Sequence, residues 1–234
     1  MRPNRLVVSH VPHHVVLRGN NRRRLFSRWS DFEQFLWYLG RALKQHACVL
    51  HALSLMSNHL HLLVTPPAEA ALPRLVHSFA QRYAVFRNRN KHGTGKVWEE
   101  RYRAYPKYTP ERILAATAYI DLNGFRGGLA AAPELHRWST CGLHAGAPEL
   151  SRIPAWMWTP SEFYLALGQS EAERGARYRQ FLAECLAADP RTLVEDGDRL
   201  AAIEALSSEP YPHRLVRPNG SRARDFGGLL YGSR

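Results

Sequence analysis

A chain of 234 residues and 26.7 kDa is long enough to bury one hydrophobic core and to carry an additional segment. Its composition, 45% hydrophobic and 22% charged, excludes wholesale disorder, collagen-like repeats and coiled-coil rods. No apolar stretch approaches the ~20 residues of a membrane-spanning helix and no apolar signal segment follows residues 1–5, so we expect a cytoplasmic protein without a membrane partner.

The net charge of +12 lies entirely in the first part of the chain. Residues 1–144 hold 21 basic and 8 acidic side chains, whereas residues 145–234 hold 11 and 12. A basic block of this size indicates a polyanionic partner, because each Lys or Arg that meets a phosphate releases condensed counterions. The alternative is a generally Arg-rich protein without such a partner.

Seven elements are predicted along the basic part of the chain, from alternation for strands and from helical spacing of apolar residues for helices. They are a strand over residues 10–18, a helix over 30–46, strands over 47–55 and 59–65, a helix over about 72–86, a strand over 97–105 and a helix over about 109–124. Ser30 with Glu33 forms a predicted capping box, and Thr109 followed by Pro110 predicts the start of the last helix.

This order of strands and helices predicts an α+β fold, a ferredoxin-like antiparallel sheet with helices packed on it. Beyond residue 144 the character changes, and capping patterns predict short helices that begin near residues 159–162, 170–173 and 189. Past Ser207 the Pro, Gly and Arg content indicates a loose tail. We therefore expect a basic domain over 1–144 and a helical C-terminal extension over 145–234.

Two histidines stand at the start of the fourth predicted element. Side chains alternate along a strand, so His59 and His61 point to one face while Leu60 points to the other. This spacing suits two ligands of one metal ion. Two histidines among twelve can also fall this way by chance and only line the sheet.

The last predicted helix offers a reactive group and a further ligand. Tyr119 and Asn123 are four residues apart and share a helix face, while Ile113, Thr117 and Ile120 lie on a stripe that can pack on the sheet. A phenol with a pKa of about 10 is a suitable nucleophile for reversible phosphodiester transfer. If this face meets the histidines, Asn123 supplies an oxygen ligand beside Tyr119. Otherwise Tyr119 is an ordinary amphipathic residue.

Several motifs in this order resemble those of single-tyrosine HUH transposases, and most closely the branch of REP-associated tyrosine transposases. They are Val15–Asn20, Leu55–His61, Trp98–Tyr102, Tyr119–Asn123 and Arg137–Thr140, so the resemblance covers roughly residues 8–142. It implies a ferredoxin-like nuclease domain that acts on single-stranded DNA. It also implies a divalent metal ion, Mg²⁺ or Mn²⁺, on His59, His61 and Asn123, with Tyr119 as the nucleophile.

The resemblance has two limits. Where the family usually carries Asn-Pro-Val-Arg-Ala-Gly after the tyrosine helix, this chain carries Asn123-Gly124-Phe125-Arg126-Gly127-Gly128, which predicts that glycine rather than proline ends the helix. Residues 145–234 match no motif of the family. Their role is left open at this point.

Basic and aromatic side chains indicate a surface for DNA. Alternation predicts that Arg101, Arg103, Tyr105 and Lys107 share one face, on which the cations follow a backbone and the ring stacks on a base. The predicted contacts as a set are Arg18, Arg22, Arg23, Arg24, Arg82, Arg89, Lys96, Arg101, Arg103 and Tyr105. The expected partner is single-stranded DNA with a hairpin.

The predicted function is a transposase-type endonuclease and strand transferase that cleaves hairpin-associated single-stranded DNA through a 5′-phosphotyrosine intermediate. One alternative is a non-catalytic nucleic-acid-binding regulator derived from such an enzyme. A second is a metal-dependent hydrolase that uses water and forms no covalent adduct. The sequence does not distinguish a monomer from a homodimer, and so leaves open whether the tyrosine serves its own histidines or those of a partner.

Overall fold

The protein is described from a computed structural model that covers residues 6–90, 94–99 and 101–188. The strands are β1 (His13–Arg18), β2 (Val49–Leu55), β3 (His59–Thr65) and β4 (Arg103–Pro106). The α-helices are α1 (Trp29–His46), α2 (Ala71–Asn90), α3 (Pro110–Arg126), α4 (Cys141–His144), α5 (Glu162–Leu165) and α6 (Glu171–Ala188). Short 3-10 turns occupy Asn20–Arg22, Pro133–Leu135, Pro148–Leu150 and Ala155–Met157.

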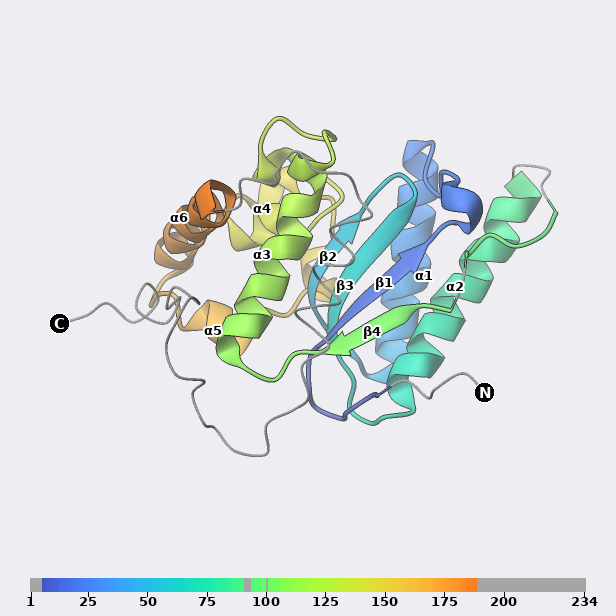
Figure 1. Ribbon diagram of the computed structural model, residues 1–234, viewed down its shortest axis with the longest axis horizontal. Helices are drawn as coiled ribbons and strands as arrows, with labels where there is room; N and C mark the ends of the chain where they lie inside the picture. Colours follow the sequence, from blue (N-terminus) through green and yellow to red (C-terminus); the bar gives the residue numbers. More distant parts are fainter. Residues whose placement is uncertain (1–5, 91–93, 100, 189–234) are drawn as a thin grey trace.

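The strands form one antiparallel sheet in the order β2-β3-β1-β4. Helices α1 and α2 cover one face of the sheet, and α3 lies across the other face over β2 and β3 (Figure 1). This order and the predicted succession of elements are those of a ferredoxin-like α+β fold, which is confirmed.

The alternation of β3 divides its side chains between two layers. Leu60, Leu62 and Val64 lie in the large core cluster beneath α1 and α2, and Leu63 lies in a smaller cluster with residues of α3. All seven residues of β3 except Thr65 are buried, because both faces of this central strand are covered.

Three predicted strands are wrong in extent. β1 begins at His13 rather than residue 10, β2 begins at Val49 rather than residue 47, and β4 spans Arg103–Pro106 rather than 97–105. Trp98 still pairs with Gly19 through one isolated bridge, which shows that the earlier part of the segment meets the same neighbouring strand without forming a regular ladder.

The ends of two helices also differ from the predictions. The predicted box of Ser30 and Glu33 is wrong, since α1 begins at Trp29 and the carboxylate of Asp31 accepts hydrogen bonds from the backbone N–H groups of Ser27 and Arg28. Thr109 caps α3 as predicted, through a hydrogen bond that its hydroxyl accepts from the Arg112 N–H.

Helix α3 does not end at Gly124. It continues to Arg126 and ends at Gly127, whose N–H donates to the Asn123 carbonyl. Gly124 is instead the point where the His136 ring packs on the helix, since a Cβ there would lie 2.2 Å from His136 Cγ.

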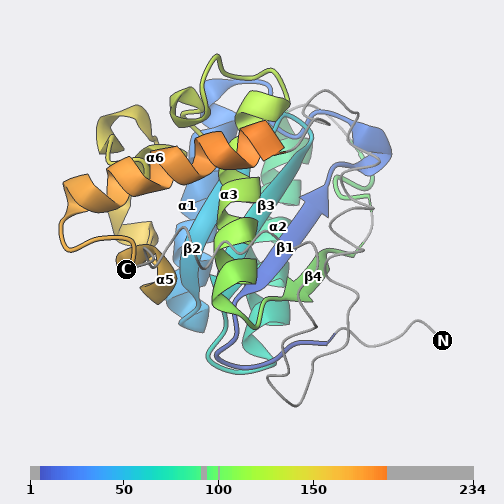
Figure 2. The ribbon, with the colours of Figure 1, turned by 60° about the vertical axis from the view of Figure 1, so that its left-hand side comes forward.

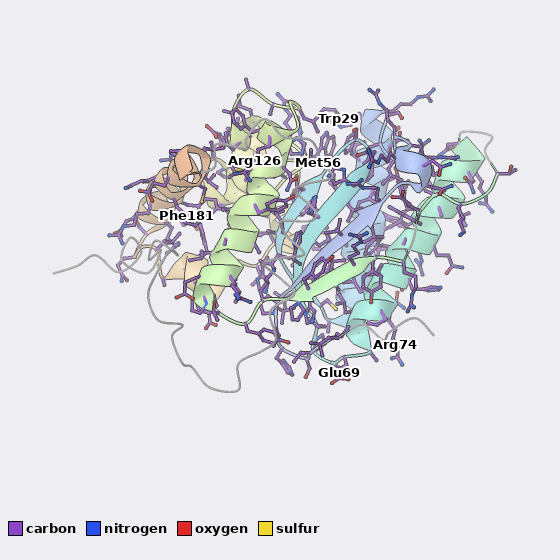
Figure 3. All side chains as sticks on the ribbon, in the orientation of Figure 1. Trp29, Met56, Glu69, Arg74, Arg126 and Phe181 are labelled. Carbon is purple, nitrogen blue, oxygen red and sulfur yellow. The ribbon has the colours of Figure 1, made fainter. Side chains whose placement is uncertain are left out.

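The described part of the C-terminal extension packs on α3. As predicted, helices begin after Ser161 and Ser170, whose hydroxyls accept from the N–H groups of Tyr164 and Glu173, but only α5 is short, since α6 has 18 residues. Helix α6 crosses α3 on the side away from the sheet (Figure 2), and Phe181 lies between these two helices (Figure 3). The predicted helix near residue 189 and the predicted tail lie outside the described residues.

None of the helices in the described part of the chain has the length and hydropathy needed to cross a membrane.

Replacing Gly124 by Ala tests the contact with His136. Helix propensity alone favours Ala over Gly by about 1 kcal/mol, whereas overpacking a buried contact costs about 1–3 kcal/mol. Because His136 is buried and the added Cβ would meet its ring, we expect Gly124→Ala to lower the free energy of unfolding in a urea titration.

The double variant Gly124→Ala/His136→Ala removes the ring and is the control. We expect Gly124→Ala to lower the free energy of unfolding less in the His136→Ala background than in the wild type. An equal decrease in both backgrounds would contradict this account.

Candidate active site

The sheet face beneath α3 carries the two predicted histidines. In the antiparallel register of β1 and β3, Arg18 lies opposite His59 and Val16 opposite His61, so these four side chains point to one face. Both histidines are nearly inaccessible to solvent.

Helix α3 brings Tyr119 to these histidines. The centroid of the Tyr119 ring lies 5.6 Å from that of His61, and the rings of His59 and His61 are 5.0 Å apart at a steep angle. The position follows from packing, because Ile113 and Ile120, which lie about two turns apart on one stripe of α3, pack against Ala52 and Leu63 of the sheet. Tyr119 therefore borders the apolar contact, at the junction of α3 and the open part of the sheet.

A third imidazole, His14 of β1, belongs to the same cluster. Its Nε2 lies 3.0 Å from His61 Nδ1, its ring stacks on His61, and its ring centroid is 5.8 Å from that of Tyr119. Sequence reasoning missed His14. The only available signal was its place in a strand of alternating faces, and the register that brings it next to His61 is a tertiary property.

The hydrogen bonds define what the ring nitrogens can do. The Asn58 side-chain oxygen only accepts, so the contact of 2.6 Å places the proton of His59 on Nδ1 and leaves a lone pair on Nε2. His61 Nε2 is buried and has no hydrogen-bond partner. A buried polar atom without a partner is costly, which is typical of a position that receives a ligand.

Burial keeps His14 and His61 uncharged. Burial and, secondarily, the charge of Lys107 lower the pKa of His14 to about 3. Burial is the main cause that lowers the pKa of His61 well below its usual value, and the positive charge of Arg18 acts in the same direction. Neutral imidazoles have the lone pairs that a cation requires.

Asn123 lies one turn after Tyr119 and is buried. Its side-chain NH₂ group donates to the Tyr119 carbonyl at 2.7 Å, so Oδ1 is the atom that can accept from or coordinate another group. Among residues 6–90, 94–99 and 101–188, no three His, Cys, Asp or Glu side chains converge as a metal site. A third protein ligand beside His59 and His61 would thus be a neutral oxygen of the kind that Asn123 carries.

The predicted DNA contacts separate into groups. Arg103 and Tyr105 of β4 pair with Val16 and His14, which places them on the same sheet face as the histidines. Arg18 is half-buried on that face. Arg82 and Arg89 lie on α2, in the layer on the opposite side of the sheet, and the remaining predicted contacts are exposed in turns: Arg22, Arg23, Arg24, Lys96 and Arg101.

Lys107 does not extend the exposed row of cations as predicted. It is 6% exposed, and burial together with the nearby charge of Arg112 lowers its pKa to about 8. The predicted alternation does not reach Lys107, because β4 ends at Pro106. The Lys107 N–H donates to the Pro12 carbonyl. Arg101 is exposed but precedes the regular strand.

The geometry agrees with a comparison with known protein families. A family model described as "Transposase IS200 like" matches residues 7–123, a range that includes the histidines, Tyr119 and Asn123. The chain belongs to the IS200-like transposase family. A search of curated protein sequences finds no match.

Two solved structures are similar to this transposase. One shows a REP-associated tyrosine transposase bound to a REP hairpin, with a TM-score of 0.51 and 13% identity over 69% of this chain and 92% of that one. The other is a protein from Deinococcus radiodurans described as a transposase, with a TM-score of 0.37 and 19% identity over 48% and 90% of the two chains. At this identity the first match supports the shared fold alone.

The buried histidines predict that the transposase loses stability in acid. The pKa values of His14 and His136 are lowered to about 3 and about 4, chiefly by burial, whereas the unfolded chain titrates near 6.5. As pH falls below 6.5, the unfolded chain binds protons that the folded chain does not, so stability decreases until the folded values are reached. At pH 5 each of these histidines removes up to about 2 kcal/mol relative to neutral pH.

Urea titrations at pH 7.5, 6 and 5 with EDTA present measure this effect. The variant His14→Phe keeps an aromatic ring without a titrating group and is expected to show a shallower pH dependence. Equal unfolding free energies at all three pH values would contradict the assignment of neutral buried histidines.

Proposed function

We propose that this transposase cleaves and rejoins single-stranded DNA, with Tyr119 as the nucleophile. The observation that carries the proposal is the position of the Tyr119 ring, 5.6 Å from the ring of His61 and on the sheet face that also bears Arg18 and Arg103. A phenol, two neighbouring imidazoles and a rim of guanidinium groups are the components of a phosphodiester transfer site.

The proposed reaction exchanges one phosphodiester for another. The Tyr119 oxygen forms a bond to phosphorus and its proton leaves to solvent, while the bond from phosphorus to the 3′ oxygen breaks and that oxygen takes up a proton. The products are a 5′-phosphotyrosyl DNA end and a free 3′-hydroxyl. A 3′-hydroxyl that attacks the tyrosyl linkage reverses the steps and joins two strands without ATP.

The residues present fit a divalent metal ion, Mg²⁺ or Mn²⁺. The unpartnered Nε2 of His61, the Nε2 of His59 and the amide oxygen of Asn123 would hold it. When bound, such an ion withdraws charge from the scissile phosphate. His14 orients His61, because a proton on His61 Nδ1 donated to His14 Nε2 leaves the Nε2 lone pair of His61 facing the site.

The exposed half of the sheet face supplies the proposed path for DNA. Arg103 is opposite Val16 and Tyr105 is opposite His14, so one guanidinium and one ring follow the strand that borders the histidines. Arg18 adds a charge at the His59 end. Cations that follow a backbone and a ring on which a base stacks are the features of single-strand binding.

The proposed substrate is DNA that carries a hairpin, like the REP hairpin to which the similar REP-associated transposase is bound in its solved structure. We propose that this chain belongs to the same branch. Residues 1–144 would form the nuclease domain and residues 145–234 a helical extension, in a monomer or a homodimer. Arg22, Arg23 and Arg24, exposed beside the turn after β1, would contact the base of the hairpin.

A covalent-adduct assay tests the nucleophile. We expect a labelled single-stranded hairpin oligonucleotide and Mn²⁺ to produce a protein–DNA band that survives denaturation, and Tyr119→Phe to abolish it, because the Tyr119 ring lies 5.6 Å from the His61 ring. Because the attacking oxygen is lost, we expect the rate of adduct formation to decrease by roughly 1,000-fold or more, as when a covalent nucleophile is removed.

Tyr38→Phe is the matched control, because Tyr38 of α1 lies in the layer on the opposite side of the sheet. Cleavage without an adduct would support a water-dependent hydrolase and overturn the proposal. DNA retention without cleavage would support a non-catalytic regulator instead.

Metal titration separates the roles of the histidines. We expect calorimetry to detect Mn²⁺ binding to the wild-type protein and none to His61→Ala, while His14→Phe weakens binding by about 10–100-fold, the usual effect of removing a partner that orients a ligand. His46→Ala, on α1 and bonded to Ser78, is the control and should bind as the wild type. Equal affinities for wild type and His61→Ala would contradict the assigned ligands.

A further inference from the structure

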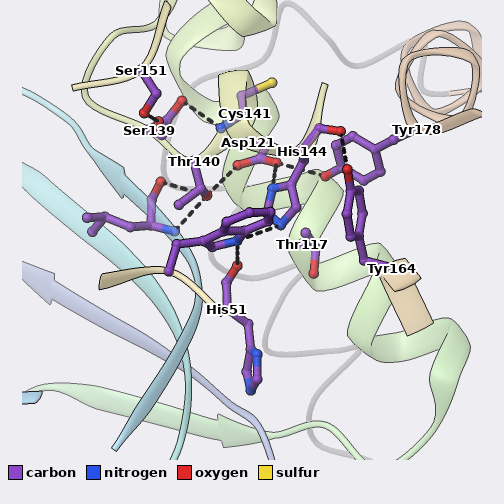
Figure 4. Close-up of polar contacts among 12 residues, drawn as sticks. His51, Thr117, Asp121, Ser139, Thr140, Cys141, His144, Ser151, Tyr164 and Tyr178 are labelled. Carbon is purple, nitrogen blue, oxygen red and sulfur yellow. Dashed lines mark hydrogen bonds and ion pairs between the residues drawn. The ribbon is translucent and has the colours of Figure 1, made fainter. Parts of the chain in front are cut away.

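The side of α3 opposite the catalytic face carries a buried carboxylate that the reaction does not use. Asp121 follows Tyr119 by two residues, which is slightly more than half a turn, and its exposed fraction is 0%. A buried carboxylate requires compensating hydrogen bonds. The three donors to this one come from two segments of the chain, residues 140–144 and α6 (Figure 4).

Asp121 accepts three side-chain hydrogen bonds. Oδ1 accepts from the Thr140 hydroxyl at 2.9 Å, and Oδ2 accepts from His144 Nδ1 at 2.7 Å and from the Tyr178 hydroxyl at 2.8 Å. The Thr140 oxygen also accepts from the Leu53 N–H, which extends the network to β2. One side chain of α3 is therefore connected to α4, to α6 and to the sheet.

The protonation of the network is set by its partners. A carboxylate only accepts, so His144 donates from Nδ1 to Asp121, while the Trp158 indole N–H donates to the His51 carbonyl at 2.9 Å and lies 3.2 Å from His144 Nε2. Burial and the Asp121 carboxylate raise the pKa of Tyr178 well above its usual value, which keeps its hydroxyl a donor. Three directed hydrogen bonds therefore stabilise the Asp121 carboxylate.

The apolar packing of α3 does not by itself define one orientation. Leu114, Ala118 and Leu122 face the cluster of α5 and α6, and these contacts are non-directional, so they tolerate small rotations and slides of the helix. Three hydrogen bonds of 2.7–2.9 Å to the Asp121 carboxylate are directional and do not tolerate such movements of the helix. A rotation of α3 that breaks them would also move Tyr119 relative to His61.

From this geometry we propose that Asp121 and Tyr178 are positioning residues for Tyr119, so that α6 of the C-terminal extension is a functional part of the catalytic unit. This inference rests on the proposed function, in which Tyr119 is the nucleophile. A displacement of reacting groups by about 1 Å can reduce a rate about 100-fold, so loss of one anchor is expected to lower the rate more than it lowers DNA affinity.

The variant Tyr178→Phe removes the α6 anchor with little change in volume. Tyr164→Phe is a matched control, because the buried Tyr164 hydroxyl donates to the His144 carbonyl at 2.8 Å in the same helical layer without touching Asp121. We expect Tyr178→Phe to lower the single-turnover rate of adduct formation at saturating DNA by at least 10-fold, with the Kd for the oligonucleotide changed less than twofold. Tyr164→Phe should change both by less than twofold.

A second pair keeps the test valid if Tyr178→Phe fails to fold. Thr140→Val removes the donor to the other carboxylate oxygen, and Thr140→Ser retains it. We expect Thr140→Val to lower the single-turnover rate of adduct formation and Thr140→Ser to keep it at the wild-type value. Thermal unfolding of all variants sets a common assay temperature at which each is fully folded.

Hydrogen exchange of residues 113–126, measured without DNA, gives an independent readout of the anchor. Faster exchange in Tyr178→Phe but not in Tyr164→Phe supports the proposal, together with the rate difference. Equal rates and equal exchange in these two variants would overturn it. Absence of any adduct from the wild-type protein would contradict the proposed function instead, and the exchange data would still support or contradict the anchor.

Discussion

The position of α3 between two apolar layers is the constraint on which the site depends. Ile113 and Ile120 meet the sheet, and Leu114 and Leu122 meet α5 and α6, so the helix is buried on both of these sides. Tyr119 lies at the boundary of this packing, where the cover of the sheet ends. Because both contacts bury the same helix, the distance between Tyr119 and the strand histidines is a property of the whole assembly of sheet and extension.

Neutral imidazoles and charged guanidinium groups occupy different depths of this site. His14 and His61 are buried and uncharged, since desolvation penalises the imidazolium form, whereas Arg103 remains exposed at the rim. In the proposed function, the guanidinium groups at the rim attract the DNA and the buried imidazoles offer nitrogen lone pairs. Because these histidines are buried in the neutral form, the free energy of unfolding decreases as the pH falls. The chemistry of the site is in this way linked to the stability of the fold.

Local sequence signals identified the elements but not all of the partners. Alternation placed His59 and His61 on one face, and helical spacing placed Ile113 and Ile120 on the stripe that packs on the sheet. The same reasoning failed for Lys107, because a period of two has no meaning after the strand ends. A glycine ends the tyrosine helix as predicted, but it is Gly127 rather than Gly124, because Gly124 is a contact point for the ring of His136.

The sequence by itself determined the order of strands and helices, the basic character of the first 144 residues and the spacing of the paired histidines, since each depends on neighbours a few residues apart. Only the tertiary structure decided that His14 supports His61 and that Tyr178 reaches Asp121, over sequence separations of 47 and 57 residues. Strand register and helix crossing set such contacts. These follow from the packing of all layers together, and a local pattern carries no information about them.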